Sequence, residues 1–233
     1  MTILCIETST SVCSAAISTD GVLNKQCISY EGGNHARLLP SYIDVLLAFA
    51  REQHLTIDAV ALSEGPGSYT GLRIGASTAK GLCYGLNVPL IPVPTLEVLK
   101  IASGIKEGIL IPMIDARRME VYTTVSGEGL PVTGARAVIV ENEESIINLQ
   151  STINNQTVYY FGDGAEKCSK IFTKPNWHYI PGIVPEARFC ADYVGSILDF
   201  SNGFIGPNTD LAYYEPFYLK EFIAAQSHVK GLK

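Results

Sequence analysis

The stretch ILCIETSTSVCSAAI, residues 3–17, decides how the rest of the sequence is interpreted. Its first apolar run ends in an acidic residue, Glu7, and a second apolar run covers residues 13–17. An Asp-Gly pair at residues 20–21 and a third run over residues 22–28 follow, which is the pattern of antiparallel strands joined by tight turns. We therefore predict a three-strand meander at the start of the chain.

The same pattern returns in the middle of the chain. Asp115 ends the apolar run IPMI as Glu7 ends the first run, which is a spacing of 108 residues, from residue 7 to residue 115. The next strand candidate, at residues 121–125, and an acid-glycine turn at residues 128–129 keep that spacing. A constant spacing of this kind indicates a duplicated unit.

Each predicted unit continues with alternating helices and strands. The first is expected to have helices at residues 36–52 and 70–86 and strands at residues 58–63 and 88–93. The second is expected to have a helix at residues 141–149, a strand at residues 157–161, and helices at residues 163–172 and 186–200. Three antiparallel strands followed by βαβ crossovers give a mixed sheet with helices on its faces.

Two such units predict an α/β protein with two lobes. The sequence SGIKEG, residues 103–108, interrupts the hydrophobic pattern, so we place the lobes at residues 1–104 and 105–233. The last segment, from Tyr213 onward, can return to the first lobe.

The composition favours a folded, acidic protein. The chain has 233 residues, of which 47% are hydrophobic and 17% are charged, so it has enough apolar material for a core. Its formal net charge is -6, whereas proteins that hold nucleic acid on their own do so mostly with Lys and Arg. A nucleic-acid partner is therefore expected only together with another subunit.

The cysteines and the start of the chain indicate a reducing compartment. No C-x-x-C pair and no metal-ligand spacing occurs, so the cysteines are interpreted as small buried hydrophobes. No positively charged start leads into an apolar signal region, and no uncharged run approaches the roughly 18 residues of a membrane helix. We expect a cytoplasmic protein that does not contact a membrane. The six cysteines are Cys5, Cys13, Cys27, Cys83, Cys168 and Cys190.

The duplicated acids allow an enzyme hypothesis. Two ribonuclease-H-like lobes, each with an acid at the end of its first strand, are the arrangement with which actin-like phosphotransferases hold nucleotide and magnesium. Glu7 and Asp115 would then be the carboxylates, and the hydroxyls of Thr8, Ser9 and Thr10 would form the phosphate loop. The alternative is that both segments only end buried strands, with the hydroxyls closing a tight turn.

The glycine-rich stretch SEGPGSYTGLRIG, residues 63–75, lacks both catalytic patterns that it resembles. It contains no Gly-Lys-Ser/Thr of a phosphate loop, and Thr70 stands where a nucleophile elbow requires glycine. Gly71, Gly75 and Ala79 follow one another at four-residue spacing, so the helix carries a ridge of small residues. We therefore predict that another helix packs closely against this ridge.

The helix expected at residues 36–52 has a wide apolar surface. Its apolar side chains cover roughly 200°, about twice the arc that a surface helix needs. One half can cover the helix's own sheet, and the other half requires a partner, the second lobe or the chain's own tail. The sequence leaves open which half is which.

Six motifs spread over nearly the whole chain resemble the bacterial TsaB family, also called YeaZ. They are IETST at residues 6–10, NHARLLP at 34–40, GPGSYTGLRIG at 65–75, KGL at 80–82, DARRMEVY at 115–122 and EPFYLK at 215–220. The resemblance implies an actin-like duplicated ribonuclease-H-like fold. It also implies a role in making threonylcarbamoyladenosine beside the anticodon of tRNAs that read codons starting with A.

The resemblance implies the partners as well. In that family the protein is a noncatalytic scaffold for the related TsaD, which transfers the threonylcarbamoyl group, and the ATPase TsaE joins the assembly. TsaD carries a metal motif N-H-x-x-x-H, and here Thr95 and Leu99 stand where its imidazoles would be. We therefore expect no catalytic residue and no metal. We expect contact with tRNA only within the complex, and a homodimer when TsaD is absent.

The expected site is a docking surface on the helices of the first lobe. No resident cofactor is expected, although a weak or shared nucleotide site can remain at Glu7, Thr8, Ser9, Thr10 and Asp115. The alternative function is an actin-like ATP-dependent phosphotransferase or ATPase that uses Glu7 and Asp115. The expected partner-binding residues are Leu39, Ile43, Leu46, Leu47, Gly71, Leu72, Gly75 and Ala79.

Overall fold

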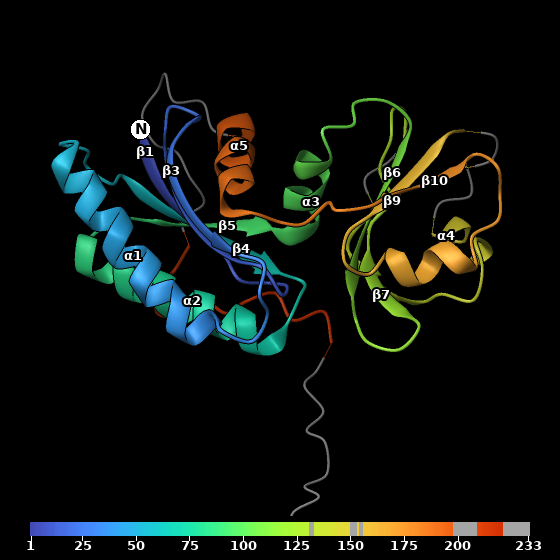
Figure 1. The fold of residues 1–233 in the computed structure, drawn as a ribbon, viewed down its shortest axis with the longest axis horizontal. Coiled ribbons are helices and arrows are strands. Elements are labelled where there is room, and N and C mark those ends of the chain that lie inside the picture. The colour runs from blue at the N-terminus through green and yellow to red at the C-terminus, as the bar shows by residue number, and fades with distance from the viewer. Residues whose placement is uncertain (131–132, 150–152, 154–155, 198–208, 221–233) are drawn as a thin grey trace, which may run out of the picture.

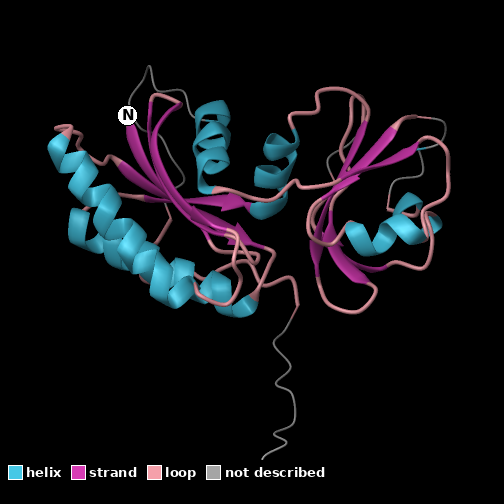
Figure 2. Ribbon diagram, viewed as in Figure 1, coloured by secondary structure: helices cyan, strands magenta, loops and turns pink. Residues whose placement is uncertain are grey.

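The structure is a computed structural model that describes residues 1–130, 133–149, 153, 156–197 and 209–220. Figures 1 and 2 show two twisted sheets side by side, each with helices packed against it. All strands of the first sheet precede those of the second in the sequence. One helix near the end of the described chain packs against the first sheet again. The predicted α/β architecture is confirmed.

The first sheet has the strand order β3-β2-β1-β4-β5. Its first three strands are antiparallel neighbours, and β4 and β5 extend the sheet in parallel with β1. The predicted meander and crossovers are therefore confirmed. The strands are β1 (Thr2–Glu7), β2 (Cys13–Thr19), β3 (Val22–Ser29), β4 (Ala59–Gly65) and β5 (Leu90–Pro94).

The second sheet, with the order β10-β9-β6-β7-β8, repeats this topology strand for strand. β6 takes the place of β1, and Asp115 ends it as Glu7 ends β1. The duplication is thus confirmed, although neither β8 nor β10 was predicted, because these strands have only four residues each. The strands are β6 (Ile109–Asp115), β7 (Glu120–Thr123), β8 (Arg136–Ile139), β9 (Val158–Phe161) and β10 (Trp177–Ile180).

The middle of strand β1, residues 3–6, is a continuous apolar run because both faces of its sheet are covered. Leu4 and Ile6 belong to the core beneath helices α1 (His35–Glu52) and α2 (Tyr69–Leu86). The alternate residues, Ile3 and Cys5, point to the opposite face and join a second core. A strand buried on both sides has a continuous apolar run rather than an alternating pattern.

The second core of the first sheet contains a helix from the far end of the chain. One side of helix α5 (Ala187–Ile197) packs on Ile3, Cys5 and Ala61 of the first sheet. The residues on that side of α5 are Ala187, Cys190, Ala191 and Val194. Figure 1 shows α5 against the first sheet, so the expectation that this helix belongs to the second unit is wrong. Helical periodicity reveals that a side is buried but not which sheet buries it.

Helix α3 (Thr95–Ser103) lies between the two sheets. Val98 joins the core of the first sheet, whereas Leu96 and Leu99 pack with Ile114 and Phe161 of the second. The other helices of the second unit are shorter than expected, because α4 covers only Glu144–Ile147 and η2 is a 3-10 turn at Glu166–Lys170. The division at residues 104 and 105 stays a prediction.

Candidate functional site

The loop after β1, residues 8–10, is closed by the start of α2. Thr8 and Ser9 have no exposed surface. The Ser68 N–H donates a hydrogen bond of 2.6 Å to the Ser9 carbonyl oxygen, and Thr8 Oγ1 donates one of 2.9 Å to the Gly71 carbonyl oxygen. Side chains added at Gly71 or Gly75 would place Cβ under 3.0 Å from Thr8. The glycines therefore permit close packing, but against the protein's own loop.

Glu7 lies below this loop and is completely buried. Its Oε1 accepts hydrogen bonds from the Ser9 N–H at 2.6 Å and from the Ser9 hydroxyl at 2.5 Å. Its Oε2 has no hydrogen-bond partner among the residues that the structure describes. Burial raises the pKa of the Glu7 carboxyl, against the lowering effects of the nearby Ser63 hydroxyl and of the bonds from Ser9.

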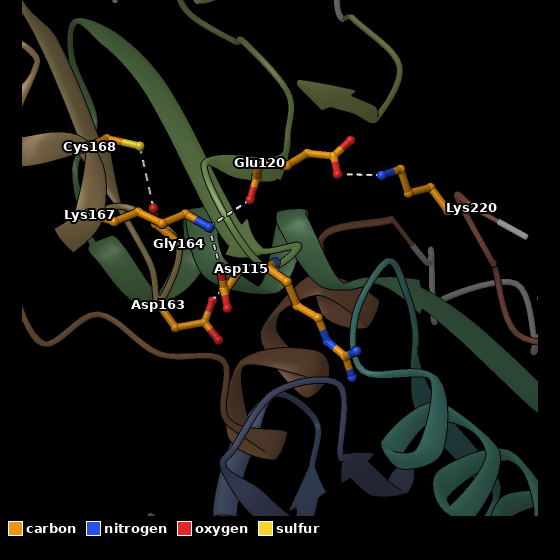
Figure 3. A network of polar contacts seen from close by, with 8 residues as sticks. Asp115, Glu120, Asp163, Gly164, Lys167, Cys168 and Lys220 are labelled. Carbon is orange, nitrogen blue, oxygen red and sulfur yellow. Dashed lines mark hydrogen bonds and ion pairs between the residues drawn. The ribbon is translucent and has the colours of Figure 1, made fainter. Parts of the chain in front are cut away.

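The second unit holds its acids differently (Figure 3). Asp115 keeps 46% of its side chain exposed and forms an ion pair with Lys167. The Lys167 ammonium also donates to the Glu120 carbonyl oxygen at 2.7 Å. Asp163 accepts a hydrogen bond of 3.0 Å from the Asp115 N–H, and its burial raises the pKa of its own carboxyl.

Neither Asp163 nor Lys167 is among the residues that the sequence analysis names. Asp163 stands two residues after the end of β9, which is the parallel neighbour of β6 in the sheet. The carboxyl ends of parallel neighbouring strands meet at one edge of the sheet. The position of Asp163 just after β9 could therefore have indicated that it lies near Asp115.

These residues do not fit a nucleotide and its magnesium ion. The loop at residues 8–10 would have to present hydroxyls and N–H groups to phosphate, but α2 covers it. Glu7 is completely buried beneath the loop at residues 8–10, and the Lys167 ammonium already compensates the charge of Asp115. The predicted residues of a nucleotide site are thus present, but not in an arrangement that admits phosphate.

The two positions at which the resemblance implies metal ligands do not suit a metal either. Thr95 is fully buried and its hydroxyl lies 2.8 Å from Ser63 Oγ, while Leu99 is part of the core at the second sheet. Neither side chain offers an imidazole. Within the described ranges, no group of three or more His, Cys, Asp or Glu side chains could hold a metal ion.

The predicted partner-binding residues require a correction, because nearly all of them face inward. The buried ones pack on the first sheet or on the loop after β1, so they cannot meet another protein without unfolding, and Leu47 is half-buried. The apolar half of each helix that covers its own sheet is the half that the prediction assigned to a partner. The buried residues are Leu39, Ile43, Leu46, Gly71, Leu72, Gly75 and Ala79.

The opposite sides of α1 and α2 form an exposed layer on the outside of the first sheet (Figure 2). Tyr84 is 86% exposed and Val45 is 43% exposed. A Cβ added at Gly81 or Gly85 would meet no atom within 4 Å, so a further helix could approach closely. We call this surface the helical face; it consists of Pro40, Ser41, Asp44, Val45, Ala48, Ser77, Gly81, Tyr84 and Gly85.

The segment 209–220 returns to the first lobe, as the sequence analysis allowed. The Phe217 N–H donates to the Glu64 carbonyl oxygen at 2.8 Å. Lys80 of α2 donates to the carbonyl oxygens of Ala212 and Tyr214 at 3.0 and 3.2 Å. Lys220 forms an ion pair with Glu120 of the second lobe, so the segment contacts both halves (Figure 3).

A groove of about 530 Å³ runs between α2 and this segment. It is lined by aromatic and charged side chains, and we call it the cationic groove. Its lining residues are Tyr69, Arg73, Ala76, Ser77, Lys80, Tyr214, Glu215, Pro216, Tyr218 and Lys220. None of the helices in the described parts of the chain is long and apolar enough to cross a membrane.

Solved structures support the fold. A Pseudomonas aeruginosa protein described as similar to peptidase YEAZ is 22% identical, with a TM-score of 0.72, over 94% of this chain and 99% of the other. YeaZ from Pseudomonas aeruginosa is also 22% identical, with a TM-score of 0.64, over 84% of this chain and 92% of the other. At this identity the likeness establishes the two-lobed fold alone.

Sequence comparison identifies the family. The tRNA threonylcarbamoyladenosine biosynthesis proteins TsaB of Bacillus subtilis and Escherichia coli are 36% and 39% identical over 53% and 52% of this chain. The chain spans about half the length of these curated relatives, 54% and 53%. A family model described as TsaD, tRNA N6-adenosine threonylcarbamoyltransferase, matches residues 29–171. Since that match covers more than half of the sequence, the chain belongs to the TsaD family, and the curated relatives to which it is similar carry the name TsaB.

Proposed function

We propose that the chain is a noncatalytic subunit of the machinery that makes threonylcarbamoyladenosine in tRNA. It acts in the cytoplasm, docks on a TsaD protein through the helical face, and has TsaE as a further partner. The family and the names of the curated relatives support the pathway. The closed loop at residues 8–10 is the observation that carries the noncatalytic role, because phosphate cannot reach its hydroxyls.

The proposal also includes the absence of a resident cofactor. Glu7 has no exposed surface, and Asp115 is paired with Lys167, so neither acid is placed to hold a metal-bound nucleotide. A nucleotide shared with another subunit would have to be held mainly by that subunit.

The test is reconstitution of the modification reaction. TsaD, TsaE, a TsaC-type enzyme and unmodified tRNA are combined with and without this chain, and threonylcarbamoyladenosine is measured in the digested tRNA. We expect product only when the chain is present. The chain alone should hydrolyse ATP no faster than buffer. A robust ATPase rate that disappears in Asp115→Asn would favour the actin-like enzyme instead.

The docking surface is tested with two exposed residues. Tyr84 is the most exposed large side chain of the helical face, and buried aromatic anchors contribute most to protein interfaces. Tyr84→Ala should weaken binding to TsaD about tenfold or more. It should also weaken the pairing of two copies when TsaD is absent.

The matched control is Ile139→Ala, which removes a 66% exposed side chain from β8 of the second lobe. Its affinity for TsaD, measured by calorimetry, should equal that of the parent. If Tyr84→Ala binds as tightly as the control, TsaD docks elsewhere.

A further inference from the structure

The cationic groove shares only Ser77 with the helical face, so the proposed docking does not use its charged and aromatic side chains. Arg73, Lys80 and Lys220 line it, and among the described residues that line it Glu215 is the one acid. The chain as a whole has a formal net charge of -6. The groove is therefore a local concentration of positive charge on an acidic protein, and its ligand is expected to be anionic.

The same groove presents a stack of flat groups. The rings of Tyr69 and Tyr218 have centroids 5.1 Å apart, with an angle of 40° between their planes. The Arg73 guanidinium lies 5.3 Å from the centre of the Tyr69 ring and donates a hydrogen bond of 2.8 Å to the Tyr69 hydroxyl. Because these contacts already hold the side chains, little conformational entropy remains to be lost when a ligand binds.

The two lysines have defined positions as well. Lys80 is held by the carbonyl oxygens of Ala212 and Tyr214, which leave its charge uncompensated. Lys220 is held at the other side by an ion pair with Glu120, which compensates its charge (Figure 3). A phosphate group could bind near Lys80 while a base stacks on the aromatic side chains of the groove.

We propose that the cationic groove binds an unpaired RNA strand, with a base on the stack of Tyr69, Arg73 and Tyr218 and a phosphate near Lys80. Proteins hold single strands by this combination of a positive groove and aromatic side chains. Bases inside a duplex are not available for stacking, so unpaired nucleotides are favoured. An acidic peptide would use the cations but gain little from the rings. This inference rests on the proposed function, which brings tRNA to the assembly.

The experiment measures fluorescence anisotropy of a fluorescein-labelled RNA of mixed sequence that forms no hairpin. It uses the full chain, alone at low salt and bound to TsaD. Tyr218→Ala and Arg73→Gln should each lower the affinity about fivefold or more. Arg73→Gln should also reduce the slope of log affinity against log salt by about 0.7. Lys106→Gln is the control, because it removes one exposed cation outside the groove.

Three results would overturn the inference. The first is that both groove variants bind the RNA as tightly as the parent does. The others are that an RNA duplex of the same length binds as tightly as the unpaired RNA, or that ADP displaces the labelled RNA as well as unlabelled RNA does. Arg73 also lies beside the helical face, so the affinity of each variant for TsaD is measured without RNA. The two proposals fail separately. If the chain does not support tRNA modification, the proposed function is wrong. If the groove variants bind RNA as tightly as the parent, only the proposal that the groove binds RNA is wrong.

Discussion

At the scale of single residues, Gly71 determines how closely α2 lies on the loop after β1. A Cβ at this position would overlap the Thr8 carbonyl oxygen, which is backbone and cannot turn aside. We expect Gly71→Ala to lower the free energy of unfolding by about 1–3 kcal/mol. The measurement is urea denaturation followed by circular dichroism.

Gly81 supplies the control for this prediction in the same helix. A Cβ there meets nothing within 4 Å, and alanine is the better helix former. Gly81→Ala should therefore raise the free energy of unfolding by about 0.5–1 kcal/mol. Equal effects of the two substitutions would show that close packing on Thr8 is not what Gly71 provides.

Glu7 gives the stability of the protein a dependence on pH. Burial raises the pKa of its carboxyl above the ordinary value of 4.5, so the folded protein keeps a proton that the unfolded chain releases. The resulting stabilisation is present below about pH 4.5 and is lost as the pH rises through the folded pKa. The free energy of unfolding of Glu7→Gln minus that of the parent should therefore increase as the pH rises from about 4.5 through the folded pKa of Glu7.

Urea denaturation at several pH values from about 4 to 8 tests this prediction. Glu52→Gln, which changes an exposed carboxyl at the end of α1, is the control and should follow the parent at every pH. A difference between Glu7→Gln and the parent that stays constant across the series would contradict the assignment.

At the scale of elements, α1 has two sides with opposite roles. Leu46 is completely buried in the first core, while its neighbour Val45 is 43% exposed on the helical face. Leu46→Ala should lower the free energy of unfolding by about 2–5 kcal/mol, because it leaves a cavity in the core. Val45→Ala should change it by about 0.5 kcal/mol or less. Thermal and urea denaturation of the two variants measure the contrast.

The elements also show how far the sequence could predict the structure. The repeat that places Asp115 as the counterpart of Glu7 correctly predicted the duplication and the first sheet, because long apolar runs and turns mark those strands. It missed β8 and β10 of the second sheet, because strands of four residues leave little pattern in the sequence. The ridge with Gly71 and Gly75 correctly indicated a close approach, yet the neighbour is Thr8 rather than a partner helix. Periodicity defines an arc on a helix, and only the three-dimensional arrangement decides what that arc contacts. The ion pair of Lys167 with Asp115 was not predicted for the same reason, since 52 residues separate the two in the sequence.

At the scale of the whole molecule, the segment 209–220 contacts both halves, and Lys80 binds it to α2 through two hydrogen bonds. Lys80→Met should release this segment while leaving both sheets intact. We expect chymotrypsin to cut near Tyr213 and Tyr214 severalfold faster than in the parent, with little change in Tm. Lys106→Met is the control. Cleavage at the parent rate would show that other contacts, such as Phe217 with Glu64, hold the segment.

The return of α5 to the first sheet affects the order of events during synthesis. Ile3, Cys5, Ala61 and Ile91 are made early, but the helix that covers them ends at residue 197. About 100 residues separate β5 from the end of α5, which is roughly 5–20 s of translation at about 5–20 residues per second. During that time the ribosome carries a sheet with one apolar face incompletely covered. The nascent chain is therefore expected to bind chaperones until α5 has emerged.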